Sequence, residues 1–420
     1  MRRTQIIKIK FQLFGFSQSK PKKTERAGNS MNKTTDKSKD ISENFTRSFI
    51  LKKKTPYRIG LIGCGQEGQR HLEEIIRIPE FNLVAAGDVR EEALKNVAKT
   101  YSVPHVYTNY EEMFAREHLD AVAVVTSADS HFPIIKCALQ RGLHVICEKP
   151  LTVEPRESNL LVSLAQKKGL LLAVTFTYRF VPDTRKIKEL ITRRKIGRLM
   201  GLHFILLHGT YQHTFSGDNL RKYEHVFTKV KGMVFDCGSH AFDLLSWYAD
   251  SPVKRVIARA QCNTGYPYPD GCTAILEYQN GVKGLYDYDK LPYYVTSFDE
   301  NSPWRNFFRI IATGTHGTVL WDFAGKAGNP RQSILKVFTQ KGSKEVIFPI
   351  YSKERSMQYQ QFALSIKSGE LTGYFPSPSE AAYTTKVADW VVKDGMKNML
   401  PGLYQIQKKR GASAANNQRK

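Results

Sequence analysis

The sequence predicts an α/β protein of two domains, the first built on a parallel sheet and the second on a large, mainly antiparallel open sheet. The chain has 420 residues, 41% of them hydrophobic, which is more apolar material than one ordinary core holds. Short apolar runs alternate with amphipathic segments from residue 57 to about 176, and longer strands with polar alternation follow. We therefore expect a first domain at 57–176 and a second at 177–400.

The first domain is predicted from five apolar runs without polar alternation, which are typical of parallel strands covered on both faces. Helical patterns, with apolar residues three and four positions apart, lie between these runs. Strand and helix repetition of this kind predicts a doubly wound domain. The runs are Ile59–Ile62, Leu83–Ala86, Ala121–Val125, Val145–Cys147 and Leu170–Val174.

The second domain is predicted to begin with a helix at 183–193 and to continue in alternating strands at 256–262, 273–278 and 282–288. The dipeptide Asn280-Gly281 between the last two strands favours a hairpin with a type I′ turn. Two further apolar-periodic segments, at 359–366 and 379–392, are predicted to be helices that return to the body of the protein.

The net charge of +24 is concentrated at the chain ends. Residues 1–56 hold 15 Lys and Arg against 4 Asp and Glu, and residues 408–420 add 5 uncompensated basic residues, which leaves about +8 for the rest. We expect basic tails at 1–56 and 401–420, the first of them disordered. The absence of acidic residues before Glu25 also resembles an organelle transit peptide, and Met31 offers a second start. Charge runs are usually solvated, so nucleic-acid binding is not expected.

The six cysteines lack C-x-x-C spacing and lie mostly in apolar runs, which indicates reduced thiols in a cytoplasmic protein. The His, Asp and Cys residues show no metal-ligand spacing, so no metal is expected. The apolar stretch near the N-terminus is broken by lysines and too short to span a bilayer, so no membrane partner is expected.

A glycine-rich loop follows the first predicted strand and opens a helix. Such a loop lets backbone N–H groups and the helix N-terminus meet a pyrophosphate. Asp88 ends the second strand 20 residues after Gly68, where a carboxylate bonds the adenine ribose hydroxyls. Together these features predict a Rossmann domain that binds NAD, although Arg90 could balance the extra phosphate of NADP. The loop consists of Gly63, Cys64, Gly65, Gln66, Glu67 and Gly68.

Two further motifs carry a family resemblance. Residues 142–150 end in Glu148-Lys149-Pro150, and residues 236–243 read Asp-Cys-Gly-Ser-His-Ala-Phe-Asp. They resemble the E-K-P and D-x-G-x-H-x-x-D signatures of the Gfo/Idh/MocA oxidoreductases, named after glucose-fructose oxidoreductase and inositol dehydrogenase. The match extends over roughly residues 57–395. The resemblance implies an active site that contains Lys149, Asp236 and His240.

Other segments extend the resemblance. Thr126–His131 is similar to the family's T-P-N-x-x-H loop beside the nicotinamide ribose, although Ser127 and Ala128 replace Pro and Asn. Tyr178-Arg179-Phe180-x-Pro182 is similar to the segment that links the family's two domains. The resemblance implies cofactor contacts for Thr126, Ser127, His131, Glu148 and Lys149, and substrate contacts for Tyr178 and Arg179.

The residue types suit alcohol oxidation, in which a group takes the hydroxyl proton while hydride leaves. His240, with an ordinary pKa near ~6.5, suits that exchange, and Lys149 would stabilise developing alkoxide charge. Asp236 would hold the hydroxyl and stabilise an imidazolium. A lone Lys is more often a solvated charge and a lone His a packed core residue, but the two motifs in family order favour the catalytic interpretation. Asp243 and Glu148 are expected to be structural or orienting.

Substrate selectivity is expected from the second domain, where residues 208–225 are rich in polar aromatics. Tyr211 and His213 are the predicted substrate contacts, because Tyr and His offer a polyol both hydrogen bonds and flat apolar faces. A surface loop with incidental aromatics is an equally weighted alternative.

The sequence therefore predicts a dehydrogenase that transfers hydride between NAD, or less favourably NADP, and a hydroxyl-bearing carbon of a sugar or cyclitol. A homo-oligomer, dimer or tetramer, is expected because an open sheet with one apolar face must be covered. The main alternative is a nicotinamide-binding sensor or scaffold without turnover, against which Lys149, Asp236 and His240 argue. Nucleic-acid binding through the tails is the third.

Overall fold

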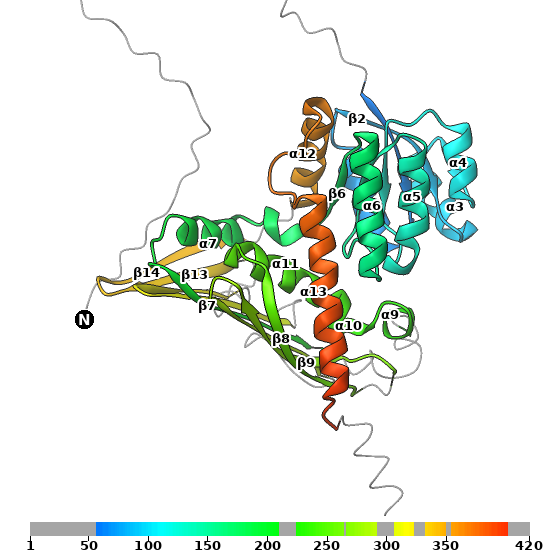
Figure 1. Cartoon of the computed structure of the whole chain (residues 1–420). Coiled ribbons are helices and arrows are strands. Elements are labelled where there is room, and N and C mark those ends of the chain that lie inside the picture. Colours follow the sequence, from blue (N-terminus) through cyan, green and yellow to red (C-terminus); the bar gives the residue numbers. More distant parts are fainter. Residues whose placement is uncertain are drawn as a thin grey trace, which may run out of the picture. The chain divides into compact units, whose positions relative to one another are not determined.

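The structure is a computed structural model that describes residues 56–209, 224–263, 266–291, 306–322, 332–349 and 354–401. Apart from Pro56 and residue 401, the two predicted tails lie outside the described residues. The described part contains a six-stranded and an eight-stranded sheet, each accompanied by helices (Figure 1). Within it, no helix is long and apolar enough to cross a membrane.

The first sheet is parallel and has the strand order β3-β2-β1-β4-β5-β6 of a Rossmann domain. Five strands match the predicted apolar runs. The sixth, β3, gives no hydrophobic signal because two of its three residues are exposed. The strands are β1 Tyr57–Ile62, β2 Phe81–Gly87, β3 His105–Tyr107, β4 Ala121–Val124, β5 His144–Cys147 and β6 Leu172–Val174.

Helices cover both faces of this sheet. Ile59 and Leu61 of β1 pack into one apolar cluster, whereas Ile62 packs into a second cluster on the opposite face. Burial on both faces explains why the strands lack polar alternation. The helices are α2 Gln66–Ile75, α3 Glu91–Tyr101, α4 Tyr110–Arg116, α5 His131–Gln140 and α6 Pro155–Lys168, with the short 3-10 helices η1 Ala128–Ser130 and η2 Thr177–Phe180.

The second sheet has the order β14-β13-β12-β11-β7-β10-β9-β8 and, among its described strands, pairs in parallel only between β7 and β10. The predicted mainly antiparallel open sheet is confirmed. Its strands are β7 Leu199–Gly209, β8 Val253–Gln261, β9 Gly271–Tyr278, β10 Lys283–Leu291, β11 Asn306–Gly314, β12 Gly317–Asp322, β13 Gln332–Thr339 and β14 Gly342–Pro349. Its helices are α7 Pro182–Thr192, α9 Glu224–Thr228, α10 Gly232–Asp236 and α11 Gly238–Ala249.

The hairpin between β9 and β10 forms where it is predicted, but its turn differs from the predicted type. Gly281 has φ of 85°, whereas Asn280 is not among the residues with positive φ, so a type I′ turn is excluded. The N–H of Gly281 donates to the carbonyl of Tyr278 at 3.0 Å, and Tyr278 N–H donates to Val282 O at 3.0 Å. This is the three-residue loop in which one glycine in the left-handed region follows a turn.

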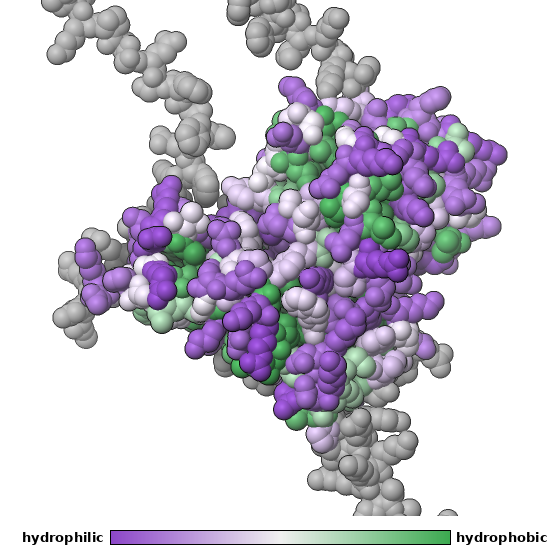
Figure 2. Space-filling view, in the orientation of Figure 1, coloured by the Kyte–Doolittle hydropathy of each residue, from purple (hydrophilic) through white to green (hydrophobic). Residues whose placement is uncertain are grey.

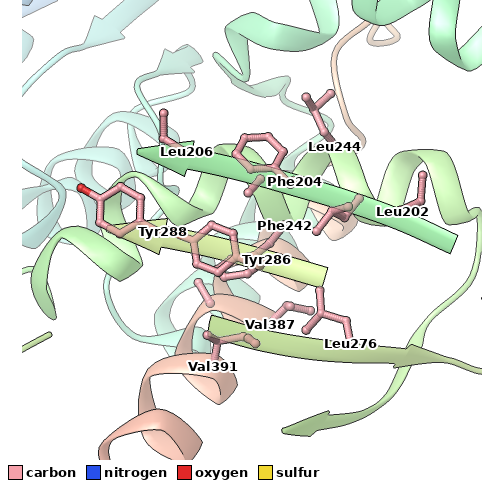
Figure 3. Close-up of a cluster of buried hydrophobic side chains, with 14 of the residues drawn as sticks. Leu202, Phe204, Leu206, Phe242, Leu244, Leu276, Tyr286, Tyr288, Val387 and Val391 are labelled. Carbon is pink, nitrogen blue, oxygen red and sulfur yellow. The ribbon is translucent and has the colours of Figure 1, made fainter. Parts of the chain in front are cut away.

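One face of the second sheet forms the main apolar core. Side chains of β7, β9 and β10 point toward helix α11 and helix α13, Pro378–Lys397 (Figure 3). Along β8 and β9, buried side chains alternate with more exposed ones, which lie on the opposite face of the sheet. None of the described helices covers that opposite face. The labelled core residues are Leu202, Phe204, Leu206, Phe242, Leu244, Leu276, Tyr286, Tyr288, Val387 and Val391.

The last two helices return to the body, as the sequence predicts, and α13 contacts both halves. Helix α12, Glu354–Ser368, packs on α2 and η2 beside the first sheet (Figure 1). Helix α13 packs on β8 of the second sheet and on α6 of the first domain. The face in Figure 2 is mostly hydrophilic, with hydrophobic residues gathered over α12 and α6, where Leu364 and Leu160 are exposed.

Candidate active site

The carboxyl ends of β1, β2 and β4 form a cleft of about 540 Å³, at the edge where open α/β sheets bind ligands. Six predicted cofactor residues line it: Gly63, Gly65, Asp88, Arg90, Thr126 and Ser127. Gln66 and Glu67 are not among the lining residues. Glu67 instead pairs with Arg70 and Arg355 on the surface of α2.

The glycine-rich loop fits a dinucleotide because its glycines leave room for close backbone approach. A Cβ on Gly63 would meet Val125 O at 2.3 Å, and one on Gly68 would meet Gly63 O at 1.9 Å. Gly65, by contrast, faces open space, with Arg90 Nη2 the nearest atom at 3.5 Å. Gly65 also caps α2 without a side-chain hydrogen bond among the described residues, so backbone N–H groups stay available to phosphate oxygens.

Asp88 lies at the end of β2, where the sequence predicts it. Its carboxylate accepts the backbone N–H of Cys64 at 2.7 Å and the guanidinium of Arg90 at 3.1 Å. Burial alone would raise the pKa of Asp88, but the hydrogen bonds from Arg90 and Cys64 hold it below its usual value. Asp88 therefore remains anionic at the cleft, with an exposed cation beside it.

The loop after β4 holds the cleft wall. Thr126 and Ser127 line the cleft, and Ser130 Oγ donates to Thr126 Oγ1 at 2.8 Å. His131 is fully buried instead, with Nδ1 3.0 Å from Pro150 O and Nε2 3.1 Å from Thr126 O. The structure thus places His131 as a link between this loop and the segment that carries Lys149.

Lys149 and Asp236 meet although 87 residues separate them. Lys149 follows β5, and its Nζ donates to Asp236 Oδ1 at 3.0 Å and to the backbone oxygen of Asp236 at 3.3 Å, at the end of α10. Burial lowers the pKa of Lys149, but the charges of Asp236, Cys237 and Glu148 outweigh it and raise the pKa. Lys149 is therefore an ammonium ion in a partly buried site.

His240 lies on the first turns of α11 beside Tyr178, with ring centroids 4.7 Å apart. Its Nδ1 is buried and has no hydrogen-bond partner among the described residues. Burial, and then the charge of Lys149, lower the pKa of His240 to about 3. The ordinary histidine pKa assumed from the sequence therefore does not hold, and the ring is neutral at physiological pH.

Arg179 is directed away from this cluster. Its guanidinium donates to Asp243 at 2.8 Å and to Glu380 at 3.4 Å, and its side chain is 5% exposed. It lines a separate cavity of about 370 Å³ that shares no lining residue with the dinucleotide cleft. The ion pair with Arg179 supports the structural role expected for Asp243. Tyr211 and His213 lie outside the described residues.

Two site features have no counterpart in the sequence-based prediction. His71 on α2 contacts Glu148, with Nε2 3.0 Å from Oε1, and Tyr359 on α12. Its one sequence signal is a polar residue on the buried face of an amphipathic helix. His225 of α9 lines the dinucleotide cleft, although the sequence places it in the substrate segment. Only the docking of α9 onto the first domain shows this.

Comparisons with known proteins agree with this geometry. The family model described as an oxidoreductase family with an NAD-binding Rossmann fold matches residues 57–176, and the GFO/IDH/MocA C-terminal domain matches residues 184–320. The myo-inositol 2-dehydrogenase of Thermotoga maritima is 24% identical over 324 residues, which are 74% of this chain and 89% of that protein.

Two solved structures share the fold. An oxidoreductase from Agrobacterium radiobacter in complex with NAD+, L-tartaric acid and magnesium has a TM-score of 0.69 at 19% identity, covering 81% of this chain and 97% of its own. The scyllo-inositol dehydrogenase of Lactobacillus casei with bound NAD(H) and scyllo-inositol has a TM-score of 0.64 at 20% identity, covering 82% and 98%. With both domain models matched in order, this chain belongs to the Gfo/Idh/MocA family of oxidoreductases.

Proposed function

We propose that this protein is an NAD-dependent dehydrogenase that oxidises a hydroxyl-bearing carbon of a sugar or cyclitol, or reduces the corresponding ketone. The observation that carries the proposal is that Lys149 bonds Asp236 and that the charges of both act on His240. Lys149 follows β5 directly, next to the strand whose end carries Thr126, so the ammonium and the cleft share one edge of the sheet. The inositol dehydrogenases among the relatives support the substrate class.

The cleft would hold the dinucleotide through Gly63, Gly65, Asp88 and the loop at Thr126. When bound, the nicotinamide supplies a hydride acceptor in oxidation and a hydride donor in reduction. Lys149, charged and partly buried, stabilises negative charge on the reacting oxygen, because a fixed cation acts strongly where water is excluded. Asp236 holds the Lys149 ammonium in position through the hydrogen bond to Nζ.

His240 is the proposed proton acceptor in oxidation. It is neutral, so a ring nitrogen has a lone pair that can accept the hydroxyl proton. A conjugate acid with a pKa of about 3 holds a proton weakly, so His240 serves as a relay and not as a resting proton store. Binding of an anionic alkoxide beside Lys149 offsets part of the positive charge that lowers this pKa.

NAD is proposed over NADP because the anionic Asp88 carboxylate lies in the cleft at the end of β2. A carboxylate bonds ribose hydroxyls and repels a 2′-phosphate. Arg90, whose side chain is 62% exposed, is the group that would favour the phosphate, but its guanidinium is paired with Asp88.

The test combines cofactor release with a substrate panel. Heating the purified protein and analysing the supernatant by absorbance and mass identifies any bound dinucleotide. Inositols, aldoses, uronates, amino sugars and nucleotide sugars are then assayed with NAD+ and NADP+, using a carbon-deuterated form of any active substrate. Transfer of deuterium to the dinucleotide supports the proposal. Tight binding of dinucleotide without turnover of any panel member would instead favour a sensor or scaffold.

A further inference from the structure

Two buried polar side chains and one partly buried carboxylate form a chain behind the active-site lysine. Glu148 Oε1 lies 3.0 Å from His71 Nε2, and His71 Nδ1 lies 2.7 Å from the hydroxyl of Tyr359. His71 is 1% exposed and Tyr359 is fully buried. The three residues come from α2, the end of β5 and α12, which are far apart in the sequence.

The hydrogen-bonding capacity of the partners fixes the form of His71. An ionised carboxylate only accepts, so Nε2 of His71 must carry a proton and donate to Glu148. The Tyr359 hydroxyl then donates to Nδ1, and a neutral ring satisfies both bonds. Burial strongly raises the pKa of Tyr359, which keeps this hydroxyl protonated. Glu148 therefore selects this tautomer, and the Tyr359 hydroxyl stabilises it by donating to Nδ1.

Glu148 passes this constraint to Lys149. The second oxygen of Glu148, Oε2, accepts the backbone N–H of Lys149 at 3.1 Å. Burial alone would raise the pKa of Glu148, but the hydrogen bond from His71 and the charge of Lys149 hold it well below its usual value. The resulting negative charge acts on the Lys149 ammonium. Burial lowers the pKa of Lys149, but the charges of Asp236, Cys237 and Glu148 raise it.

The same helix carries the dinucleotide loop. Helix α2 begins at Gln66, within the glycine-rich loop, and carries Glu67 and His71 one turn apart. Both side chains are held by α12, Glu67 by Arg355 and His71 by Tyr359. Hydrogen bonds of His71 and Glu148 thus connect α2, whose N-terminus is expected to meet the cofactor phosphates, to the segment that carries Lys149.

We infer that His71 is a positioning residue that acts through Glu148, linking the dinucleotide-binding helix to Lys149, and that Tyr359 supports the tautomer that donates to Glu148. The inference rests on the proposed function, because it assigns Lys149 to the reacting oxygen. His71 itself is not among the residues that line the cleft, and its hydrogen bonds within the described residues go to Glu148 and Tyr359.

The test uses three variants in the full-length protein. His71→Leu removes the donor to Glu148 and should lower kcat about tenfold or more, with the NADH dissociation constant changed less than about threefold. The acid limb of the kcat/KM profile should move to higher pH, because the partly buried Glu148 loses a stabilising hydrogen bond. His71→Gln keeps an amide donor and should recover most of the activity. Tyr359→Phe should lower kcat and move the acid limb to higher pH, as His71→Leu does, but by less.

Two controls separate this role from a structural one and from the proposed function. The hydroxyl of Tyr101 on α3 donates at 3.2 Å to Glu73, which lies on α2 as His71 does. Tyr101→Phe removes this hydroxyl and should leave activity unchanged. Competitive labelling of Lys149 with acetic anhydride, read by mass spectrometry, needs no turnover. Faster labelling in His71→Leu and wild-type labelling in His71→Gln support the link even if no substrate is found. Wild-type labelling and an unchanged pH profile in a folded His71→Leu would overturn it.

Discussion

Lys149 and His240 carry different charges, and the difference suits the two proposed roles. Lys149 is an ammonium ion and His240 a neutral ring, so in the proposed mechanism Lys149 stabilises charge while His240 accepts a proton. Lys149→Ala and His240→Ala should each lower kcat about 10²-fold or more, the range typical of a positioned acid or base. The double variant should lose little more, because both residues serve one event. Steady-state kinetics on all three variants measures this.

Cofactor binding provides the control for these variants. Neither Lys149 nor His240 lines the dinucleotide cleft, so NADH affinity, measured by fluorescence titration, should change little. Near wild-type turnover in His240→Ala would contradict the assignment. The proton acceptor would then be Asp236, which bonds Lys149, or Tyr178, which packs against the ring.

Asp88 is expected to decide the choice between the two dinucleotides. The wild-type protein should bind NADH more tightly than NADPH, because the carboxylate repels the additional phosphate. Asp88→Ser removes that charge and frees Arg90, so the preference should shift toward NADPH. Arg90→Ser is the matched control and should lower NADPH affinity. An unchanged affinity ratio in Asp88→Ser would remove Asp88 from cofactor discrimination.

The partly buried His240 also makes stability depend on pH. Its folded pKa of about 3 lies below the ordinary value of 6.5, so between these values the unfolded chain binds a proton that the folded protein does not. Stability is therefore fully present above pH 6.5 and falls as the pH drops, by about 1.4 kcal/mol per unit for this group. His240→Gln should lower this slope in urea unfolding measured from pH 7 to pH 5. Parallel slopes would show that His240 titrates equally in both states.

At the scale of elements, α13 depends on a defined N-terminal cap. Ser377 Oγ accepts the N–H of Glu380 at 3.2 Å, and the Glu380 carboxylate accepts the N–H of Ser377 at 2.9 Å. Because α13 packs on both β8 and α6, fraying of its first turn weakens contacts with both halves of the described chain. Ser377→Ala should lower the free energy of unfolding by about 1 kcal/mol. Ser379→Ala, on the same exposed turn, should lower the free energy of unfolding much less. Equal decreases in the thermal unfolding midpoint of the two variants would contradict the capping role.

At the scale of the whole molecule, the uncovered face of the second sheet predicts self-association. Strand register aligns Ile257 of β8 with Ile275 of β9, and Ile275 in turn with Leu285 of β10. The row continues through His203 to Ile311 and Leu320. Such a row of aliphatic side chains on an exposed sheet is typical of a surface that a second copy covers. We propose a dimer or tetramer that uses this face.

Light scattering tests this proposal. The protein should elute at a multiple of its 47.9 kDa chain mass, and Ile275→Asp should shift it toward the monomer, because a buried unpaired charge opposes association. Leu160→Asp, which changes an aliphatic residue of α6 that is 52% exposed, is the control and should leave the mass unchanged. A wild-type monomer at micromolar concentration would defeat the proposal.

The sequence by itself determined the fold class, the glycine-rich loop and the residues at the ends of β2 and β5. These features are local: apolar runs record burial on both faces, and glycines and a carboxylate stand at fixed spacing from strand ends. It did not determine β3, whose three residues are too few and too exposed to give a pattern. It also predicted the wrong turn type at Asn280-Gly281, because a glycine that adopts positive φ fits a three-residue hairpin loop as well as a type I′ turn.

Tertiary structure alone decided what each site residue contacts and which charge it carries. Asp236 reaches Lys149 and Arg179 reaches Asp243 only because distant segments dock, and no spacing in the sequence encodes those distances. The lowered pKa of His240 follows from burial and a neighbouring ammonium, which the residue type does not reveal. The sequence does not reveal the proposed role of His71 either, because that role depends on contacts with Glu148 and Tyr359, which come from two other elements.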